Sequence, residues 1–485
     1  MIILLIWIVV LAAAVTLYLR QTYSRFSDYG VKHLKVVPFF GNVMKVFLRL
    51  EHFSEDLTKN YRTFSDERYI GRYEFLTPTI LVRDLDLVKK ITIKDFEYFL
   101  DHRGFTDEVI DPLFGRNIFS LKGCLDVECK ELTSRYTNDV IASCAFGLKV
   151  NSHNDDKNIF YEMGKSVSTF RLRQMMLFFA VSACPSLVRK LKLTLFPKRT
   201  KDFFIDIVQR TMKDREDQNI IRPDIIHLLM EAKKGKLSHG DTASRDRDTG
   251  FATVEESLIG KKKTSRTWSD IDLIAQAVLF FIAGFEPIST TMSFALLELA
   301  KHTEIQERLV KEIKEHHAKN GGKINFNSIQ TMAFLDMVVS EILRLWPPAV
   351  GTERVCVRNY NLGKPNNKAE KDFFIRKGEN IWLPIWCFHR DPNYFPNPEK
   401  FDPERFSEKN RHKINTMAYM PFGLGPRNCI GSRFALCELK VLLYQIILHF
   451  EVSPSDKTVF NGKLDTDSLN PIHKNGYWLK FKCRY

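Results

Sequence analysis

The cysteines of this chain lack the spacing of a disulfide framework. The nine cysteines are an odd number and are scattered from Cys124 to Cys483. A secreted disulfide scaffold would need an even set at regular spacing, so this distribution indicates a reducing compartment. Cys429 has no second cysteine or histidine at ligand spacing, and Cys437 stands eight residues further on, which excludes a Cys-x-x-Cys zinc site.

The sequence also lacks any basic run interleaved with aromatic residues. Its net charge is +14 and its isoelectric point is about 9.2, yet the clusters Lys233–Lys234 and Lys261–Lys263 lie in polar stretches. Such clusters are expected to be solvated charge, and nucleic acid is therefore excluded as a partner. The positive balance instead suits an anionic membrane surface or an acidic protein.

Charged side chains are missing from residues 1–19. As a helix this segment would be roughly 28 Å long, close to the thickness of a hydrocarbon core. A cleaved signal peptide ending at Ala12–Ala14 is the alternative, but no positive segment precedes the apolar run, which continues past the alanines. Positive residues follow the run at Arg20, Arg25, Lys32 and Lys35, which predicts that the rest of the chain faces the cytosol.

Nothing divides the remaining chain, so one large domain is expected. Hydrophobic residues make up 44% of the 485 residues and include 38 phenylalanines, enough for a large core. We expect a strand pair and a short helix within residues 70–93 and a helix over 138–147 that ends on a glycine. Residues 170–197 are an apolar region with basic flanks, either a core helix or a membrane-contacting cap. Residues 238–267 are polar and predict a mobile surface loop.

Residues 268–300 predict one long, mostly apolar helix. Ser269 and Asp272 form a capping box at its start. Gln276, Glu286 and Pro287 interrupt the apolar sequence, which argues against a second membrane span. The helix is therefore expected to be buried in the protein.

A glycine-rich loop at Phe422–Gly431 presents Cys429 just before a helix. A thiolate is a soft ligand that suits iron, and a helix N-terminus favours its deprotonated form. Gly425 and Gly431 would let the backbone turn beneath a flat cofactor, while Phe422 would cover the sulfur. Arg427 would bind a carboxylate. The loop therefore predicts a thiolate-ligated iron cofactor.

This decapeptide resembles the haem-ligand signature F-x-x-G-x-R-x-C-x-G of the cytochromes P450 at every fixed position. Two further family motifs precede it in order: Glu341–Arg344 fits E-x-x-R, and Pro403–Phe406 fits P-E-R-F. In the family, Arg405 joins Glu341 and Arg344 as a triad. The sequence before Glu341 is too apolar for a solvated face, so the pair is expected to be buried and mutually neutralised.

The resemblance implies a mainly α fold with small β-sheets, a single large haem domain behind an N-terminal transmembrane helix. The expected boundaries are an anchor over residues 1–19, a hinge over 20–42 and the haem domain over 43–485. Residues 35–42 resemble the family's hinge, although their proline content is low.

Ala283, Gly284 and Glu286 match the first part of A-G-x-(D/E)-T-(T/S), the family's oxygen-activation groove. Gly284 is expected to leave room for dioxygen, and Glu286 to orient a proton-delivering water chain. The family threonine is replaced by Pro287, which removes a hydroxyl and frees a helix carbonyl. Thr290 and Thr291 lie on the same face, about 5 Å further along the axis; Thr290 is the candidate substitute, acting through water.

Tryptophan is absent between Trp7 and Trp268. The family carries a W-x-x-x-R helix here that binds the haem propionates. The chain instead passes from Gly123 directly to Cys124 and resumes family-like sequence at Arg135, so the haem domain is expected to be internally shortened after Gly123. Propionate binding would then fall to Arg103, Arg354 and Arg427, the first two matched by position only.

The resemblance implies a haem-thiolate monooxygenase that inserts one oxygen atom from O2 into apolar small molecules, xenobiotic or lipid-like. The segments Glu353–Arg358 and Phe388–Pro392 resemble the insect and vertebrate xenobiotic-metabolising branch. Haem b is the implied cofactor, with Cys429 as its axial ligand. NADPH and flavins would act only through a partner reductase, with cytochrome b5 as a further candidate donor, at the endoplasmic reticulum membrane.

Two alternatives stay open. A haem-thiolate lyase or isomerase acting on a peroxide is favoured by Pro287 and disfavoured by Glu286. An inactive, haem-poor variant is favoured by the gap after Gly123.

Overall fold

The structure is a computed structural model of the chain. It describes residues 2–95, 99, 125–155, 157–168, 172–194, 196–234, 251–253, 268–460, 462–466, 468 and 470–484. Arg103 and the join at Gly123–Cys124 lie outside the described residues.

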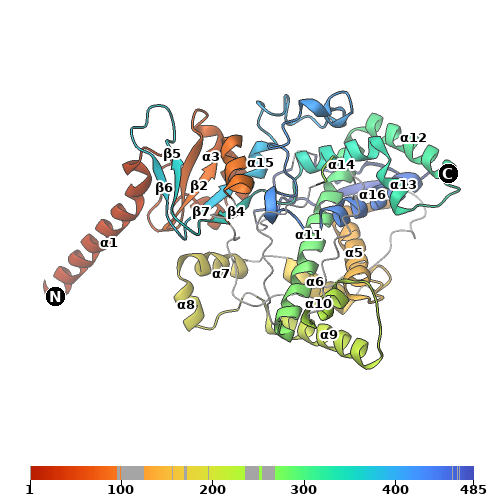
Figure 1. The fold of residues 1–485 in the computed structure, drawn as a ribbon, viewed down its shortest axis with the longest axis horizontal. Helices are drawn as coiled ribbons and strands as arrows, with labels where there is room; N and C mark the ends of the chain where they lie inside the picture. Colours follow the sequence, from red (N-terminus) through yellow and green to blue (C-terminus); the bar gives the residue numbers. More distant parts are fainter. Residues whose placement is uncertain are drawn as a thin grey trace.

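The described residues form a mainly helical protein with three small sheets, which confirms the predicted mainly α fold with small β-sheets (Figure 1). The α-helices are α1 (Ile2–Asp28), α2 (Met44–Phe47), α3 (Phe53–Thr63), α4 (Leu85–Lys89), α5 (Cys129–Ile141), α6 (Ile159–Ser168), α7 (Leu172–Ala183), α8 (Pro185–Lys190), α9 (Lys198–Asp217), α10 (Ile225–Lys233), α11 (Asp270–Lys301), α12 (Thr303–Lys319), α13 (Phe326–Gln330), α14 (Ala333–Leu345), α15 (Ile385–Phe388) and α16 (Ser432–His449). Single-turn helices are η1 (Lys90–Lys94), η3 (Ala142–Phe146), η4 (Pro403–Phe406), η5 (Arg411–Lys413) and η6 (Gly425–Arg427).

The strands join segments that are far apart in the sequence. They are β1 (Tyr69–Glu74), β2 (Thr77–Val82), β3 (Leu125–Glu128), β4 (Thr352–Val355), β5 (Tyr360–Gly363), β6 (Phe373–Ile375), β7 (Asn380–Leu383), β8 (Phe450–Pro454) and β9 (Trp478–Cys483). The largest sheet has the order β1-β2-β7-β4, and a second has the order β3-β9-β8. The second sheet therefore ties the segment just after the join to the C-terminal strand.

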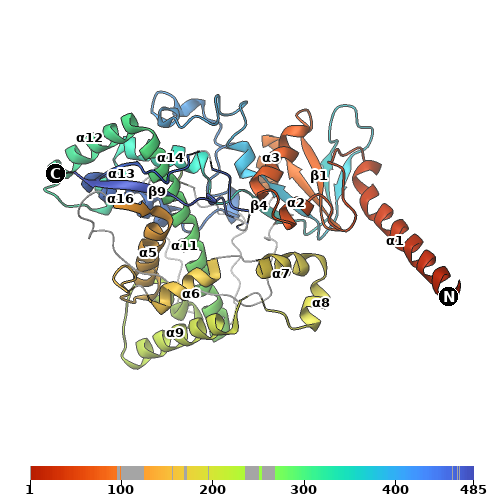
Figure 2. The ribbon, with the colours of Figure 1, turned by 180° about the vertical axis from the view of Figure 1, so that it is seen from behind.

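Helix α11 runs through the middle of the molecule, with α5 alongside it (Figure 2). Its predicted capping box between Ser269 and Asp272 is present. Residues before Glu286 pack into one apolar cluster with α6, α9 and α10, and residues from Ile288 onward pack into a larger cluster with α14 and α16. Among residues with described side chains, α11 alone is long and apolar enough to cross a membrane, but its packing makes it a core helix.

Helix α1 extends into the first part of the expected hinge over residues 20–42. Helix α1 continues without a break from Ile2 to Asp28. Phe26 is 1% exposed and packs on the ring of Tyr73 at 4.8 Å between centroids. Arg25 forms an ion pair with Glu379. The apolar residues that follow the charged break at Arg20 therefore fix the end of α1 to the globular part.

Three local predictions can be compared with the structure. Residues 70–93 contain β1, β2, α4 and η1, as expected. The helix over 138–147 ends at Gly147, whose φ of +71° is in the left-handed region. Within the predicted loop 238–267, the described residues are pinned: Ala252 is buried and the Phe251 amide donates to Asp336 (2.9 Å).

We predict that Phe26→Ala lowers the free energy of unfolding by about 3–5 kcal/mol, because it removes a buried aromatic ring. Phe374→Ala is the matched control, since Phe374 is 51% exposed. Chemical denaturation in detergent measures both. Equal stability of the two variants would show that α1 is not part of the folded unit.

Candidate functional site

The loop before α16 holds the Cys429 sulfur at an exposed position. The Cys429 amide donates to the Phe422 carbonyl (2.8 Å) and the Asn428 amide to the Gly425 carbonyl (3.0 Å). These two bonds close the turn so that the cysteine lies just outside the first turn of α16. The predicted placement of Cys429 at a helix start is confirmed.

The two glycines of the motif differ in whether the backbone geometry requires a glycine. Gly425 has a φ of +72°, and a Cβ there would lie 1.9 Å from the Thr92 carbonyl oxygen. The glycine therefore lets the loop pack against η1. Gly431 has a φ of −96°, and a Cβ would lie 4.0 Å from the Cys429 sulfur. Only Gly425 is required by backbone geometry.

The thiol of Cys429 is not deprotonated by its surroundings alone. Removal of water around the sulfur raises its pKa above the usual value, and a hydrogen bond from the Gly431 backbone lowers it less. The role of the helix N-terminus in keeping the sulfur anionic stays a prediction. A bound metal cation would supply the missing stabilisation of the thiolate.

The surroundings of Arg354 test whether an anionic cofactor fits beside this loop. Its side chain is fully buried, and its terminal nitrogens donate to the carbonyls of Glu353 (2.7 Å) and Leu424 (3.5 Å). Its Nε has no hydrogen-bond partner among the described residues. Desolvation and the positive charge of Arg427 lower the pKa of Arg354 to about 10. An anion beside the two guanidinium groups would offset both the desolvation of Arg354 and its repulsion from Arg427. The carboxylates of haem are anions of this kind.

The triad residues form the buried cluster that was expected. Glu341 and Arg344 are both 0% exposed. Arg344 donates to Glu341 through Nε to Oε2 (2.6 Å) and through a terminal nitrogen to Oε1 (2.9 Å). Arg405 reaches the same carboxylate at 3.4 Å, and the Asp402 amide donates to it at 2.8 Å. Burial raises the pKa of Glu341, while the two arginines oppose that shift.

His389 connects the triad to the cysteine loop. Arg344 donates to the His389 carbonyl (2.8 Å), and His389 Nδ1 lies 3.1 Å from the Arg344 carbonyl. Because a carbonyl only accepts, Nδ1 carries the proton, and Nε2 accepts from the Met420 amide (2.9 Å). Burial and the charge of Arg344 lower the pKa of His389 to about 3, so the ring is neutral. Sequence reasoning saw His389 only as part of a family-like segment.

The face of α11 near the site is open at two positions one turn apart. Leu279 is 57% exposed and Ala283 is exposed, although most of the helix is buried. Positions i and i+4 share a helix face, so these two side chains border one unfilled region. Ala283 was expected at the oxygen site, and Leu279 was missed.

Gly284 does not border that open region. A Cβ on Gly284 would lie 2.4 Å from Ile141 Cδ1 of α5. The glycine therefore allows α5 and α11 to approach closely. A role of Gly284 in making room for dioxygen stays a prediction.

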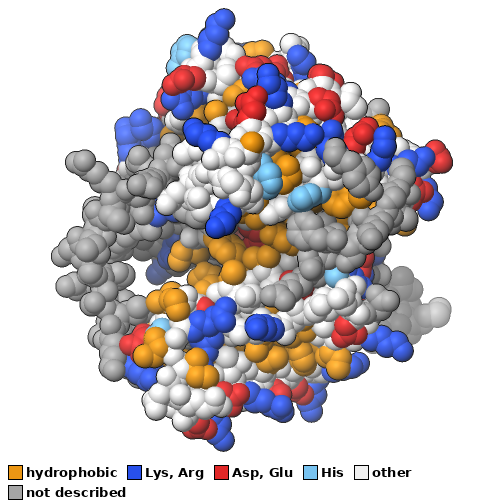
Figure 3. Space-filling model, turned by 90° about the vertical axis from the view of Figure 1, so that its right-hand side faces the viewer, with side chains coloured by type: hydrophobic (Ala, Val, Ile, Leu, Met, Phe, Trp, Pro, Cys, Tyr) orange, Lys and Arg blue, Asp and Glu red, His pale blue; other side chains and the backbone are white. Residues whose placement is uncertain are grey.

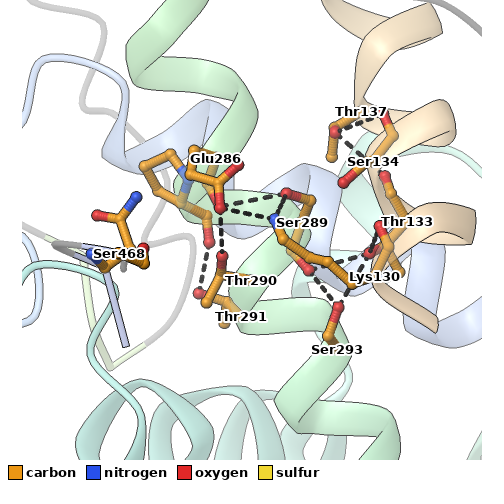
Figure 4. Close-up of polar contacts among 12 residues, drawn as sticks. Lys130, Thr133, Ser134, Thr137, Glu286, Ser289, Thr290, Thr291, Ser293 and Ser468 are labelled. Atoms are coloured by element: carbon orange, nitrogen blue, oxygen red, sulfur yellow. Dashed lines mark hydrogen bonds and ion pairs between the residues drawn. The ribbon is translucent and has the colours of Figure 1, made fainter. Parts of the chain in front are cut away.

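Glu286 lies in a polar cluster between α5 and α11 (Figure 4). Its Oε1 accepts from Thr290 Oγ1 (3.2 Å) and pairs with Lys130 Nζ (2.9 Å). Lys130 also donates to the hydroxyl of Ser289. Thr290 therefore contacts Glu286 directly, whereas Thr291 donates to the Pro287 carbonyl (2.8 Å).

Lys130 is a residue that sequence reasoning missed. It lies on α5, just after β3, and 156 positions before Glu286, so no local spacing connects the two. The indirect signal was that a carboxylate inside an apolar helix needs a cation. The contact with Lys130 fixes the orientation of the Glu286 carboxylate.

Glu438 of α16 is a buried carboxyl whose two oxygens lack hydrogen-bond partners among the described residues. It is 4% exposed, and desolvation raises its pKa well above 4.5. The side of the molecule with α12 and α16 shows a hollow in which hydrophobic side chains are exposed (Figure 3). On the cysteine loop itself, Ile430 is 85% exposed. An unpaired acid and uncovered apolar side chains are what a missing structural segment would leave behind.

A loop-borne cysteine before a helix, a buried Glu-Arg pair behind it and cationic side chains beside it define a haem-thiolate type of protein. The chain matches the family model "Cytochrome P450" over residues 122–479. It is 37% identical to "Cytochrome P450 9e2" of Blattella germanica, with 96% of each chain covered. It is 36% identical to "Probable cytochrome P450 9f2" (95% of each chain) and 33% to "Probable cytochrome P450 6a13" (96% of this chain, 95% of the relative), both of Drosophila melanogaster. The chain belongs to the cytochrome P450 family, which implies haem-thiolate monooxygenase chemistry.

The first of these matches extends over 527 aligned positions, more than the 485 residues of the chain. The relative therefore has residues with no counterpart in this chain. The family model begins to match at residue 122, next to the expected join after Gly123.

We predict that Glu341→Gln destabilises the protein by about 3–5 kcal/mol, because Arg344 would keep a buried charge without a full partner. Glu408→Gln is the control, since the Glu408 side chain is 92% exposed. Expression yield and denaturation midpoints report the difference. A Glu341 variant with the midpoint of the Glu408 variant would contradict the buried pairing.

We predict that Glu438→Gln removes a pH dependence of stability. The folded-state pKa of Glu438 is raised, so the native state binds more protons than the unfolded state above about pH 4.5. Stability of the unaltered chain should therefore fall as the pH rises above that value. The glutamine variant should be more stable by about 1–3 kcal/mol at pH 8 and equal at low pH. Parallel pH profiles of the two proteins would contradict the prediction.

Proposed function

We propose that the chain is a membrane-anchored haem-thiolate monooxygenase that inserts one oxygen atom from O2 into apolar small molecules, xenobiotic or lipid-like. Bound haem b would supply the redox chemistry of dioxygen activation. The observation that carries this proposal is the exposed Cys429 sulfur beside the buried Arg354, whose Nε is unpaired among the described residues. A thiolate and an anion-binding cation side by side are the two contacts that a haem needs.

Each residue of the site then has a defined task. Cys429 would hold the haem iron through its sulfur, with Phe422 and Gly431 next to it in the loop. Arg354 and Arg427 would bind the haem carboxylates, and Arg103 is proposed for the same task from its sequence position. Neutral His389 and the triad hold the loop in place.

On the other side of the proposed haem, α11 contributes Ala283 as the wall. Glu286 is the proton carrier of the site, and Thr290 donates to the carboxylate that would exchange protons with water. Lys130 holds the Glu286 carboxylate in position. Pro287 supplies no hydroxyl at the position next to Glu286, so proton delivery would depend on Thr290.

The membrane anchor is proposed from α1. Its large apolar side chains are exposed on several sides of the helix, with Trp7 at 67%, Leu11 at 65% and Leu17 at 66%. Such a surface is stable in a bilayer. Residues 1–19 are the proposed span, and the positive residues after it place the haem domain on the cytosolic side of the endoplasmic reticulum. The proposed domain begins near Phe26, because the end of α1 is packed on the sheet.

Electrons are proposed to come from NADPH through a flavoprotein reductase, with cytochrome b5 as a second donor. The net charge of +14 suits an acidic partner. Exposed Arg427 beside Cys429 places positive charge where such a partner would need to approach.

Two other functions have one supporting observation each. Pro287 in place of the family threonine favours a lyase or isomerase that rearranges a peroxide. The unpaired Glu438 favours a haem-poor variant, because it marks a face that lacks its covering segment.

We predict that Cys429→Ser abolishes the carbon-monoxide difference spectrum of a thiolate-ligated haem, because serine is no soft anionic ligand. Cys437→Ser, eight residues further on, should keep it. Spectra of the reduced full-length proteins measure this. An unchanged spectrum in the Cys429 variant would overturn the proposal, and no haem in the unaltered chain would favour the haem-poor variant.

A further inference from the structure

A pocket of about 600 Å³ lies where α1 meets the rest of the protein. Figure 1 shows the end of α1 beside β5 and β6. The pocket is lined from α1 by Gln21, Thr22, Ser24, Arg25 and Asp28, and from the rest of the chain by Tyr29, Pro78, Lys371 and Arg376. None of these residues belongs to the proposed haem site.

The pocket carries an excess of positive charge. Arg25 is paired with Glu379, and it donates to the Phe374 carbonyl (3.1 Å). Lys371 and Arg376 have no carboxylate partner among the described residues. Asp28 is the opposing charge in the lining, and it accepts from Ser24 (2.9 Å). Two unpaired cations against one carboxylate favour an anionic ligand.

The Arg25 guanidinium pairs with Glu379 through one terminal nitrogen only. Its Nε is buried and has no hydrogen-bond partner among the described residues. Desolvation and the positive charge of Arg376 lower the pKa of Arg25 to about 10. Its guanidinium is fixed over the ring of Phe373 at 5.3 Å. An anion in the pocket would bind a preorganised cation and offset the repulsion between the two arginines.

The depth of the pocket identifies the source of the anion. Residues 21–25 lie about 3–9 Å along the helix axis beyond the last residue of the proposed span. The headgroup layer on each side of a bilayer is about 5–8 Å thick. The pocket would therefore lie at the level of the lipid phosphates.

We propose that the pocket formed by Arg25, Lys371 and Arg376 binds the phosphate of an anionic phospholipid headgroup. The proposal rests on the anchoring of α1 proposed above. Basic pockets beside a membrane helix recognise such lipids through point charges and guanidinium hydrogen bonds. The bound lipid would fix the orientation of the domain on the membrane, since α1 and the sheet both contact it.

The test uses the full chain in vesicles of phosphatidylcholine with and without phosphatidylglycerol. The test variant is Lys371→Glu/Arg376→Glu. The control is Lys311→Glu/Lys314→Glu, which makes the same charge change at exposed positions of α12, at the other end of the molecule from α1 (Figure 1). Lipids retained after extraction in mild detergent are counted by native mass spectrometry, and thermal unfolding verifies that each variant is folded.

We expect the unaltered chain and the control to retain phosphatidylglycerol about 30-fold over phosphatidylcholine, since Lys371 and Arg376 contribute about 1 kcal/mol each toward an anionic lipid. The test variant should retain the two lipids equally. Equal selectivity in all three proteins, or equal loss in both variants, would overturn the proposal. Complete displacement of the lipid by inorganic phosphate would also overturn it, because the ligand would then be a soluble anion.

Flotation with pure phosphatidylcholine vesicles separates this proposal from the anchor. A chain that fails to float has no anchor. Lipid retention in phosphatidylglycerol-doped micelles then still tests whether the pocket binds an anionic lipid. A chain that floats without lipid selectivity keeps its anchor and contradicts the pocket alone.

Discussion

The buried ion pair between Glu341 and Arg344 is the interaction on which the haem-side architecture depends. Two charges with no exposed surface are stable only when every donor and acceptor is satisfied. Arg344 achieves this by donating to Glu341 and to the backbone of residues 389 and 400. The pair therefore fixes the path of a long, irregular segment. His389 transmits that fixed position to the Met420 amide, only nine residues before Cys429.

The other half of the site depends on how closely α5 and α11 pack. Gly284 allows Ile141 of α5 to contact the α11 backbone, and this close contact is what brings Lys130 to Glu286. The same helix pair thus determines both the apolar core and the orientation of the proposed proton carrier. β3 fixes the start of α5 through its pairing with β9.

Two features of the structure lie outside these contacts of the candidate site. Glu438 is buried without a partner among the described residues, and apolar side chains are exposed in the hollow seen in Figure 3. Both features cost free energy in water. The residues of the candidate site are positioned by the triad and by the packing of α5 on α11, and Glu438 takes no part in either set of contacts. A change at Glu438 is therefore expected to alter the stability of the chain without altering the contacts of the candidate haem site.

The sequence by itself determined the family, the cysteine ligand, the Glu341–Arg344 pair and the long helix with its capping box. Each of these rests on local spacing, which a helix turn or a loop motif converts directly into geometry. Only the tertiary structure decided that Lys130 pairs with Glu286, that Gly284 faces α5, that Arg354 keeps an unpaired Nε and that α1 runs into the folded domain. These features join residues far apart in the chain. They arise from the way helices and strands pack together. Burial of apolar surface and pairing of charges favour that packing, and no local sequence pattern predicts it.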